Sequence, residues 1–204
     1  MKLLQWNIIL KEYLIQSLHT VKLKGYDQYP IYKDAEISLK KNVDTNTLVP
    51  TQRYVLRSGV ETILAIHDLF QKERVNIFDL DFGLVFTLGY DNGTEDGPIY
   101  FLPPIVEESY EKDGTIRIIN DGMHRIAAAR LLKRNINIIL ITGVNPLFPY
   151  YAYPLPNGWD DVSTVERLTD NFKRKEYRVP ENHKALFRDF NEPFPGIQKE
   201  RRSV

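Results

Sequence analysis

The spacing of apolar and polar positions along the chain predicts both helices and strands. Residues 6–23 and 58–73 place apolar side chains three and four positions apart, which predicts two amphipathic helices. Ser58 and the glutamate three positions after it form a capping-box pattern, so we expect Ser58 to be the N-cap of the second helix. Residues 135–144 are an almost continuous apolar run, typical of a buried strand, and residues 35–39 alternate as a half-buried strand does.

Turn residues divide the rest of the chain. Residues 91–98 and 111–114 carry the asparagine, aspartate and glycine residues of hairpin turns. Residues 162–168 and 184–190 have apolar side chains spaced for two short helices. Strands and helices thus follow one another along the chain, which predicts a mixed sheet with helices beside it.

Residues 116–132 combine a strand, a tight turn and a helix. A β-branched run at 116–119 meets turn residues at 120–122, and three alanines follow in a helical pattern. A glycine turn that opens a helix leaves backbone N–H groups pointing outward, which suits an anion. His124 and Arg125 stand in the first turn, where a cationic pair opposes the helix dipole at a cost of a few tenths to about 1 kcal/mol. A bound phosphate would offset that cost, so the sequence predicts a phosphate site here.

A second polar segment follows Pro50. Proline favours an extended backbone in the residue before it, and it has no N–H to donate to a neighbouring strand. We therefore expect Thr51, Gln52 and Arg53 just past the end of a strand. Loop positions of this kind, held by a rigid scaffold, often belong to binding sites. The alternative is that Thr51 caps the following helix.

Four other features each allow a structural and a functional interpretation. Asp79 and Asp81 could share a cation or belong to a solvated strand face. His67 lies near an apolar stripe, where packing is the commoner role. The proline- and tyrosine-rich residues 145–159 form either a packed loop or a lid over the site. The basic residues 173–175, like those at 199–202, suit either a solvated face or a polyanion contact.

Composition narrows the classes of function. The 204 residues are 43% hydrophobic, enough for a core, and correspond to one domain with additions or two small ones. Lysine and arginine together number 27, as do aspartate and glutamate, so the formal net charge is zero and no global attraction to nucleic acid is indicated. The absence of cysteine excludes disulfides and thiol chemistry. Charged residues interrupt the first apolar stretch, so we expect no membrane segment and a cytoplasmic protein.

Three segments in order resemble the ParB/sulfiredoxin superfamily. Val49-Pro50-Thr51-Gln52-Arg53, called here the first box, resembles the first motif of the family. Residues 103–106 resemble the strand entry, and Asp121-Gly122-Met123-His124-Arg125 resembles the signature turn. The resemblance implies an α+β fold with a mixed sheet and flanking helices. It divides the chain into an N-terminal helical segment (1–34), a nucleotide-binding domain (35–144) and an aromatic, charged C-terminal extension (145–204).

The resemblance also implies a nucleotide site. The nucleotide would be held by Thr51, Gln52, Arg53, Gly122, Met123, His124 and Arg125. Asp121 and His124 would be catalytic, with Asp121 also the metal ligand for Mg²⁺ that accompanies ATP, ADP or CTP. The structural alternative is that Asp121 caps the helix, His124 packs, and Arg125 pairs with an acid such as Glu107.

The function implied is a nucleotide-dependent phosphotransferase or NTPase acting on a small polar acceptor. Sulfiredoxins carry a cysteine where this chain has Met123, and partition proteins carry a helix-turn-helix that residues 145–204 do not suggest. The nearest members in motif are free-serine-kinase-like transferases, although these have an acid in the first box where this chain has Gln52. The alternative is a DNA- or RNA-binding ParB-like module without catalysis.

Overall fold

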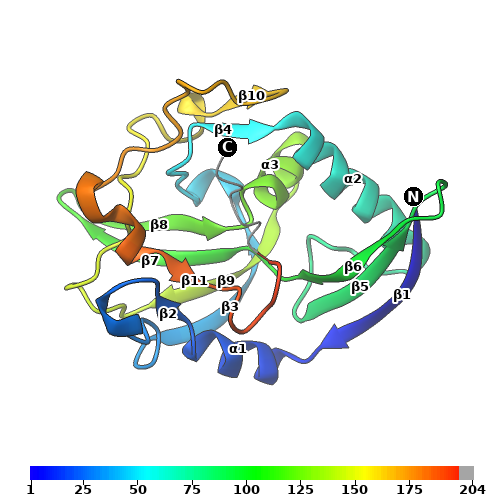
Figure 1. Cartoon of the computed structure of the whole chain (residues 1–204), viewed down its shortest axis with the longest axis horizontal. Coiled ribbons are helices and arrows are strands. Elements are labelled where there is room, and N and C mark those ends of the chain that lie inside the picture. The colour runs from blue at the N-terminus through cyan, green and yellow to red at the C-terminus, as the bar shows by residue number, and fades with distance from the viewer. Residues whose placement is uncertain (198–204) are drawn as a thin grey trace.

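A four-stranded mixed sheet forms one side of the molecule (Figure 1). The structure is a computed structural model and describes residues 1–197. The strand order is β3-β9-β7-β8, where β7 is parallel to β9 and the other neighbours are antiparallel. The strands span Glu36–Val43 (β3), Ile105–Glu111 (β7), Gly114–Asp121 (β8) and Ile136–Thr142 (β9).

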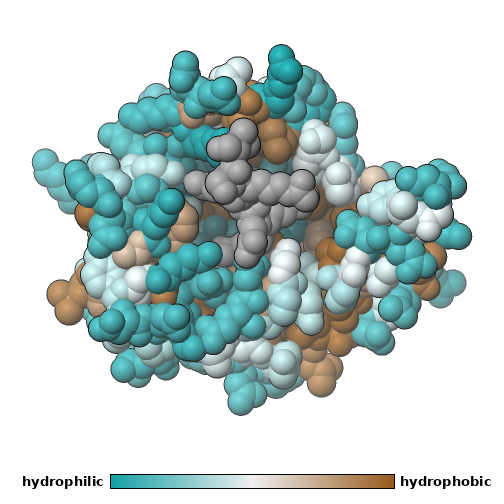
Figure 2. Space-filling view, in the orientation of Figure 1, coloured by the Kyte–Doolittle hydropathy of each residue, from teal (hydrophilic) through white to brown (hydrophobic). Residues whose placement is uncertain are grey.

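A second, antiparallel sheet lies on the other side, to the right in Figure 1. Its order is β1-β5-β6, formed by Lys2–Ile9, Gly83–Gly89 and Glu95–Phe101. Ile8 of the outer strand β1 is exposed, and so is Leu10, just after the end of that strand. Figure 2 shows hydrophobic residues gathered where β1 gives way to the next helix, on a face that is otherwise mainly hydrophilic.

Within residues 1–197, three α-helices accompany the sheets: α1 (Lys11–His19), α2 (Arg57–Lys72) and α3 (Met123–Leu131). α2 and α3 pack on each other, and α3 lies between the two sheets in Figure 1. One apolar cluster joins both helices to both sheets, with Phe70, Phe86, Ile126 and Ile138 among its buried members. The two helices are therefore held by a common core.

Short elements attach the C-terminal extension to the rest. β10 (Ser163–Val165) pairs in parallel with β4 (Tyr54–Leu56), and β11 (Arg188–Asp189) pairs antiparallel with β2 (Lys22–Leu23). The remaining elements are 3₁₀ turns at Tyr26–Gln28, Thr45–Thr47, Gly158–Asp161 and Pro180–Leu186.

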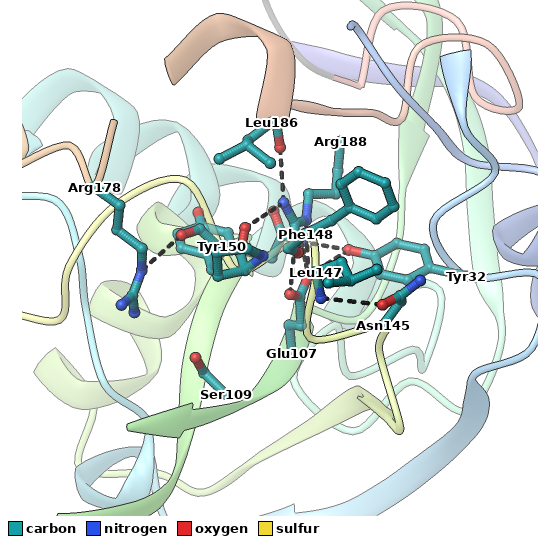
Figure 3. A network of polar contacts seen from close by, with 12 residues as sticks. Tyr32, Glu107, Ser109, Asn145, Leu147, Phe148, Tyr150, Arg178, Leu186 and Arg188 are labelled. Carbon is teal, nitrogen blue, oxygen red and sulfur yellow. Dashed lines mark hydrogen bonds and ion pairs between the residues drawn. The ribbon is translucent and has the colours of Figure 1, made fainter. Parts of the chain in front are cut away.

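A buried ion pair fixes the same extension to the four-stranded sheet (Figure 3). The Arg188 guanidinium donates to both carboxylate oxygens of Glu107 on β7, at 3.0 and 2.6 Å. Tyr32 donates its hydroxyl to the same carboxylate (2.7 Å), and Asn120 donates to the Tyr32 hydroxyl (2.7 Å). Burial raises the pKa of Tyr32 well above its usual value, and the negative charge of Glu107 is the second cause of this rise.

Several sequence predictions are confirmed. The fold class is α+β. Residues 116–132 form β8, a glycine turn and α3, and residues 135–144 contain β9. The expected hairpin turns join β5 to β6 and β7 to β8.

Others are wrong. Residues 6–9 belong to a strand rather than to a helix over 6–23, because they pair with β5 and only α1 is helical. Residues 163–165 pair with β4 instead of forming a helix, and 184–190 hold the end of a 3₁₀ turn and then β11. The basic residues 199–202 lie outside the described residues. Within residues 1–197, no helix is both long enough and apolar enough to cross a membrane.

Candidate functional site

A pocket of about 530 Å³ opens beside the first turn of α3. That volume is in the range of small-molecule sites. Its polar wall comes from the first box, the signature turn and the extension, and its apolar wall from α2 and β6. The lining residues used below are Thr51, Gln52, Ile63, Ile66, Ile99, Phe101, Asn120, Asp121, Gly122, Met123, His124, Arg125, Tyr151 and Lys175.

Gly122 makes the turn between β8 and α3. Its φ of +95° lies in the left-handed region, which glycine adopts without strain. An added Cβ would also come within 2.9 Å of the Pro104 Cα. The first intrahelical bond runs from the Ile126 N–H to the Gly122 carbonyl (3.0 Å). The three preceding N–H groups therefore have no acceptor inside the helix and lie at its positive end, as the sequence predicted.

Asp121 and Arg125 form an ion pair one turn apart, with the Arg125 Nη2 donating to the Asp121 Oδ2. Arg125 is only 8% exposed, and its guanidinium lies 5.2 Å from the centre of the Phe101 ring. Its Nε is buried and has no hydrogen-bond partner among residues 1–197. The structural alternative expected Arg125 to pair with an acid such as Glu107. Arg125 does pair with an acid, but the acid is Asp121, and Arg188 occupies the Glu107 carboxylate.

His124 joins the starts of the two central helices. The Leu56 backbone N–H donates to the His124 Nε2 (3.1 Å), so this nitrogen is an acceptor and only Nδ1 can carry the ring proton in the neutral form. Gly59 permits the approach, since a Cβ there would come within 2.5 Å of the His124 Cδ2. The N-cap of α2 is Leu56, so the prediction of Ser58 as N-cap is wrong.

The first box lies against the end of β8. The Val49 N–H donates to the Arg117 carbonyl (2.8 Å) and the Ile119 N–H to the Val49 carbonyl (3.0 Å), which brings Thr51 and Gln52 to the pocket. The Gln52 Nε2 donates to the Tyr54 carbonyl (2.7 Å). Thr51 does not cap a helix, because β4 intervenes before α2.

Arg53 points elsewhere. It is outside the pocket wall formed by the described residues, and its guanidinium lies 3.7 Å from a carboxylate oxygen of Glu176. Of the predicted nucleotide ligands, the structure therefore brings six together at one pocket and separates Arg53 from them.

A family model described as the ParB CE domain matches residues 13–163, about three quarters of the chain. The chain belongs to the ParB CE domain family. No curated protein matches it. The match includes the first box and the signature turn, so ParB-like membership agrees with the motifs from which it was expected.

Two polar residues that line the pocket of this ParB-like chain were not among the predicted nucleotide ligands. Lys175 and Tyr151 belong to the extension, and Lys175 lies beyond the matched segment. The Lys175 Nζ donates to the Tyr151 hydroxyl (2.5 Å) and to the Thr51 hydroxyl (3.2 Å). The sequence showed only a basic run here, and nothing in that run distinguishes the buried Lys175 from the two basic residues before it.

The other candidates do not meet at the pocket. Asp79 lies 3.5 Å from Arg134, and Asp81 accepts from Lys41 at 2.9 Å, so the two carboxylates have separate partners. His67 packs against a phenylalanine ring, and burial lowers the pKa of its imidazole. Among residues 1–197 no three histidine or acidic side chains form a metal cluster.

The aromatic loop is fixed to the segment around the first box by two hydrogen bonds. Leu155 donates its N–H to the Pro50 carbonyl (3.0 Å), and Trp159 donates its indole N–H to the Leu48 carbonyl (2.8 Å). Trp159 lines a separate groove of about 670 Å³ between α2 and α3. The loop thus contributes Tyr151 to the first pocket, while its end serves another surface.

Proposed function

We propose that this protein binds a nucleoside triphosphate in the pocket beside α3 and transfers its terminal phosphoryl group to a small polar acceptor or to water. The observation that carries the proposal is the convergence of the glycine-turn helix start, Arg125 and the first box on one cavity. Backbone N–H groups at a helix start and a guanidinium are both suited to phosphate.

The two walls of the pocket differ in chemistry, which supports a nucleotide over a bare anion. Ile63 and Ile66 of α2 face Ile99 and Phe101 of β6, and together they offer an apolar surface for a nucleoside. The polar wall begins at the signature turn, next to that surface. A ligand with a flat apolar end and an anionic chain fits this division.

Within this proposal, Gly122 and Met123 bring the backbone to the phosphates, and Gln52, His124 and Arg125 donate to them. The acceptor hydroxyl forms a new O–P bond as the bond from the terminal phosphorus to the diphosphate oxygen breaks. The hydroxyl proton passes to the Asp121 carboxylate. Atoms and charge balance with a diphosphate as leaving group.

Asp121 also fits the role of a magnesium ligand. Mg²⁺ is commonly held by one or two carboxylates together with phosphate oxygens and water, and a single carboxylate at this turn matches that pattern. When bound, the ion neutralises phosphate charge. The choice between an adenine nucleotide (ATP or ADP) and CTP depends on the apolar wall, which would hold the nucleoside.

Among ParB-like proteins, we propose a kinase-like member related to the free-serine-kinase-like group, in which Asp121 supplies the acid that the first box lacks. The alternative role, nucleic-acid binding, has less support in the described chain. In the basic run, Lys173 pairs with Glu176 at 3.1 Å and Lys175 is buried, and just after the run Arg178 pairs with Glu111. These side chains do not form an open cationic face.

Calorimetry with ATP, ADP and CTP in the presence of Mg²⁺ tests the proposal. We expect at least one of them to bind with micromolar affinity, and ³¹P NMR with a panel of amino acids and sugars should show conversion to diphosphate. Absence of binding by all three nucleotides at millimolar concentration would contradict the proposal.

A further inference from the structure

Lys175 has an unusual environment for a lysine. It is 9% exposed, and its Nζ lies 4.6 Å from the centre of the Tyr151 ring. Its two hydrogen-bond partners are the hydroxyls of Thr51 and Tyr151, and no carboxylate of residues 1–197 lies within salt-bridge distance of its Nζ. Burying a lysine charge without an opposite charge is costly, so the environment calls for an anion.

One of the three ammonium donors has no partner in the described part of the chain. Lys175 and its two hydroxyl partners all line the pocket. Arg125 lines it too, is equally well buried, and has its own unpartnered Nε. The pocket therefore holds two buried cationic side chains whose donors are incompletely used.

The order of groups across the pocket shows which part of a ligand Lys175 would meet. The apolar wall belongs to α2 and β6, on the right of Figure 1, and the signature turn opens α3 in the middle. Lys175 donates to Thr51, which follows directly after the segment paired with β8, the strand to the left of α3 in Figure 1. A nucleoside on the apolar wall places its first phosphates at the turn and the end of its phosphate chain at Lys175.

We propose that Lys175, supplied by the extension, is the ligand for the terminal phosphoryl group and makes the site prefer triphosphates to diphosphates. This inference rests on the proposed function. Thr51 and Tyr151 hold the amine in place, and binding of the third phosphate gives the buried charge its missing partner. The extension is then part of the binding site.

The test compares ATP and ADP affinities by calorimetry in the parent and in Lys175→Met, which keeps the side-chain length without the charge. We expect ATP affinity to fall about 10- to 100-fold, as for loss of a charged hydrogen bond, while ADP affinity changes little. The matched control is Lys173→Met, in the same basic run but exposed and paired with Glu176. It should leave both affinities as in the parent.

Each outcome has a separate meaning. A parent that binds no nucleotide overturns the proposed function and this inference with it. A parent that binds ATP no tighter than ADP, or a Lys175→Met variant that keeps the parent ratio, overturns this inference alone. If Lys175→Met does not fold, Tyr151→Phe decides: it removes one hydroxyl that positions the amine, and an unchanged ATP-to-ADP ratio would contradict the inference.

Discussion

Replacing Arg188 with methionine is expected to lower the free energy of unfolding by about 3–5 kcal/mol, because it leaves a buried carboxylate without its partner. The Arg188 side chain is fully buried and uses all five donors. Besides Glu107, these donors reach the carbonyls of Phe148, Pro149 and Leu186. Burial alone would lower the pKa of Arg188, but the neighbouring Glu107 charge raises it above the usual value. The melting temperature should fall by on the order of 10 °C.

The pairing itself can be separated from the loss of packing. The double variant Glu107→Gln with Arg188→Met removes both charges and should be more stable than Arg188→Met alone. Lys41→Met, which removes an exposed ion pair with Asp81, should melt close to the parent. An Arg188→Met variant that melts with the parent would show that the network in Figure 3 does not hold the extension.

Replacing Arg125 with alanine is expected to weaken nucleotide binding by about 1.5–3 kcal/mol, or roughly 10- to 150-fold, if its guanidinium is the main phosphate ligand.

Asp121→Asn should keep the turn and the affinity while lowering turnover by about 10²- to 10⁴-fold, since an amide cannot accept the proton. Calorimetry and ³¹P NMR measure the two effects separately.

Arg130→Ala is the matched control for these variants. Arg130 is on the same helix, but it lies 4.5 Å from the Trp159 ring and lines the other groove. It should change neither affinity nor turnover. If Arg125→Ala binds nucleotide like the parent, Asp121→Asn keeps the turnover of the parent, and both variants only have lower melting temperatures, the ion pair is structural and the enzyme proposal is contradicted.

Local patterns predicted the signature turn well. The strand, Gly122 and α3 are adjacent in sequence, so the turn residues between them predicted the glycine turn, whereas the ion pair of Asp121 with Arg125 was not predicted. The α2–α3 contact was not predictable in the same way. It depends on Gly59 meeting His124, residues that only the tertiary fold brings together.

Long-range pairing explains the failures. Trp6 and Ile9 fit a helical spacing, yet they pair with Phe86 and Gly83, nearly eighty residues further on. The spacing of a few apolar residues cannot distinguish these possibilities when the partner strand is remote. Lys175 is a similar case, since its burial depends on contacts with Thr51, more than a hundred residues earlier.

The most direct test of the central claim is a crystal structure of the protein with a non-hydrolysable ATP analogue and Mg²⁺. The account predicts phosphate oxygens about 3 Å from the backbone nitrogens of Met123 and His124, which is the distance of an N–H···O hydrogen bond. Phosphates bound elsewhere, for example in the groove beside Trp159, would contradict it.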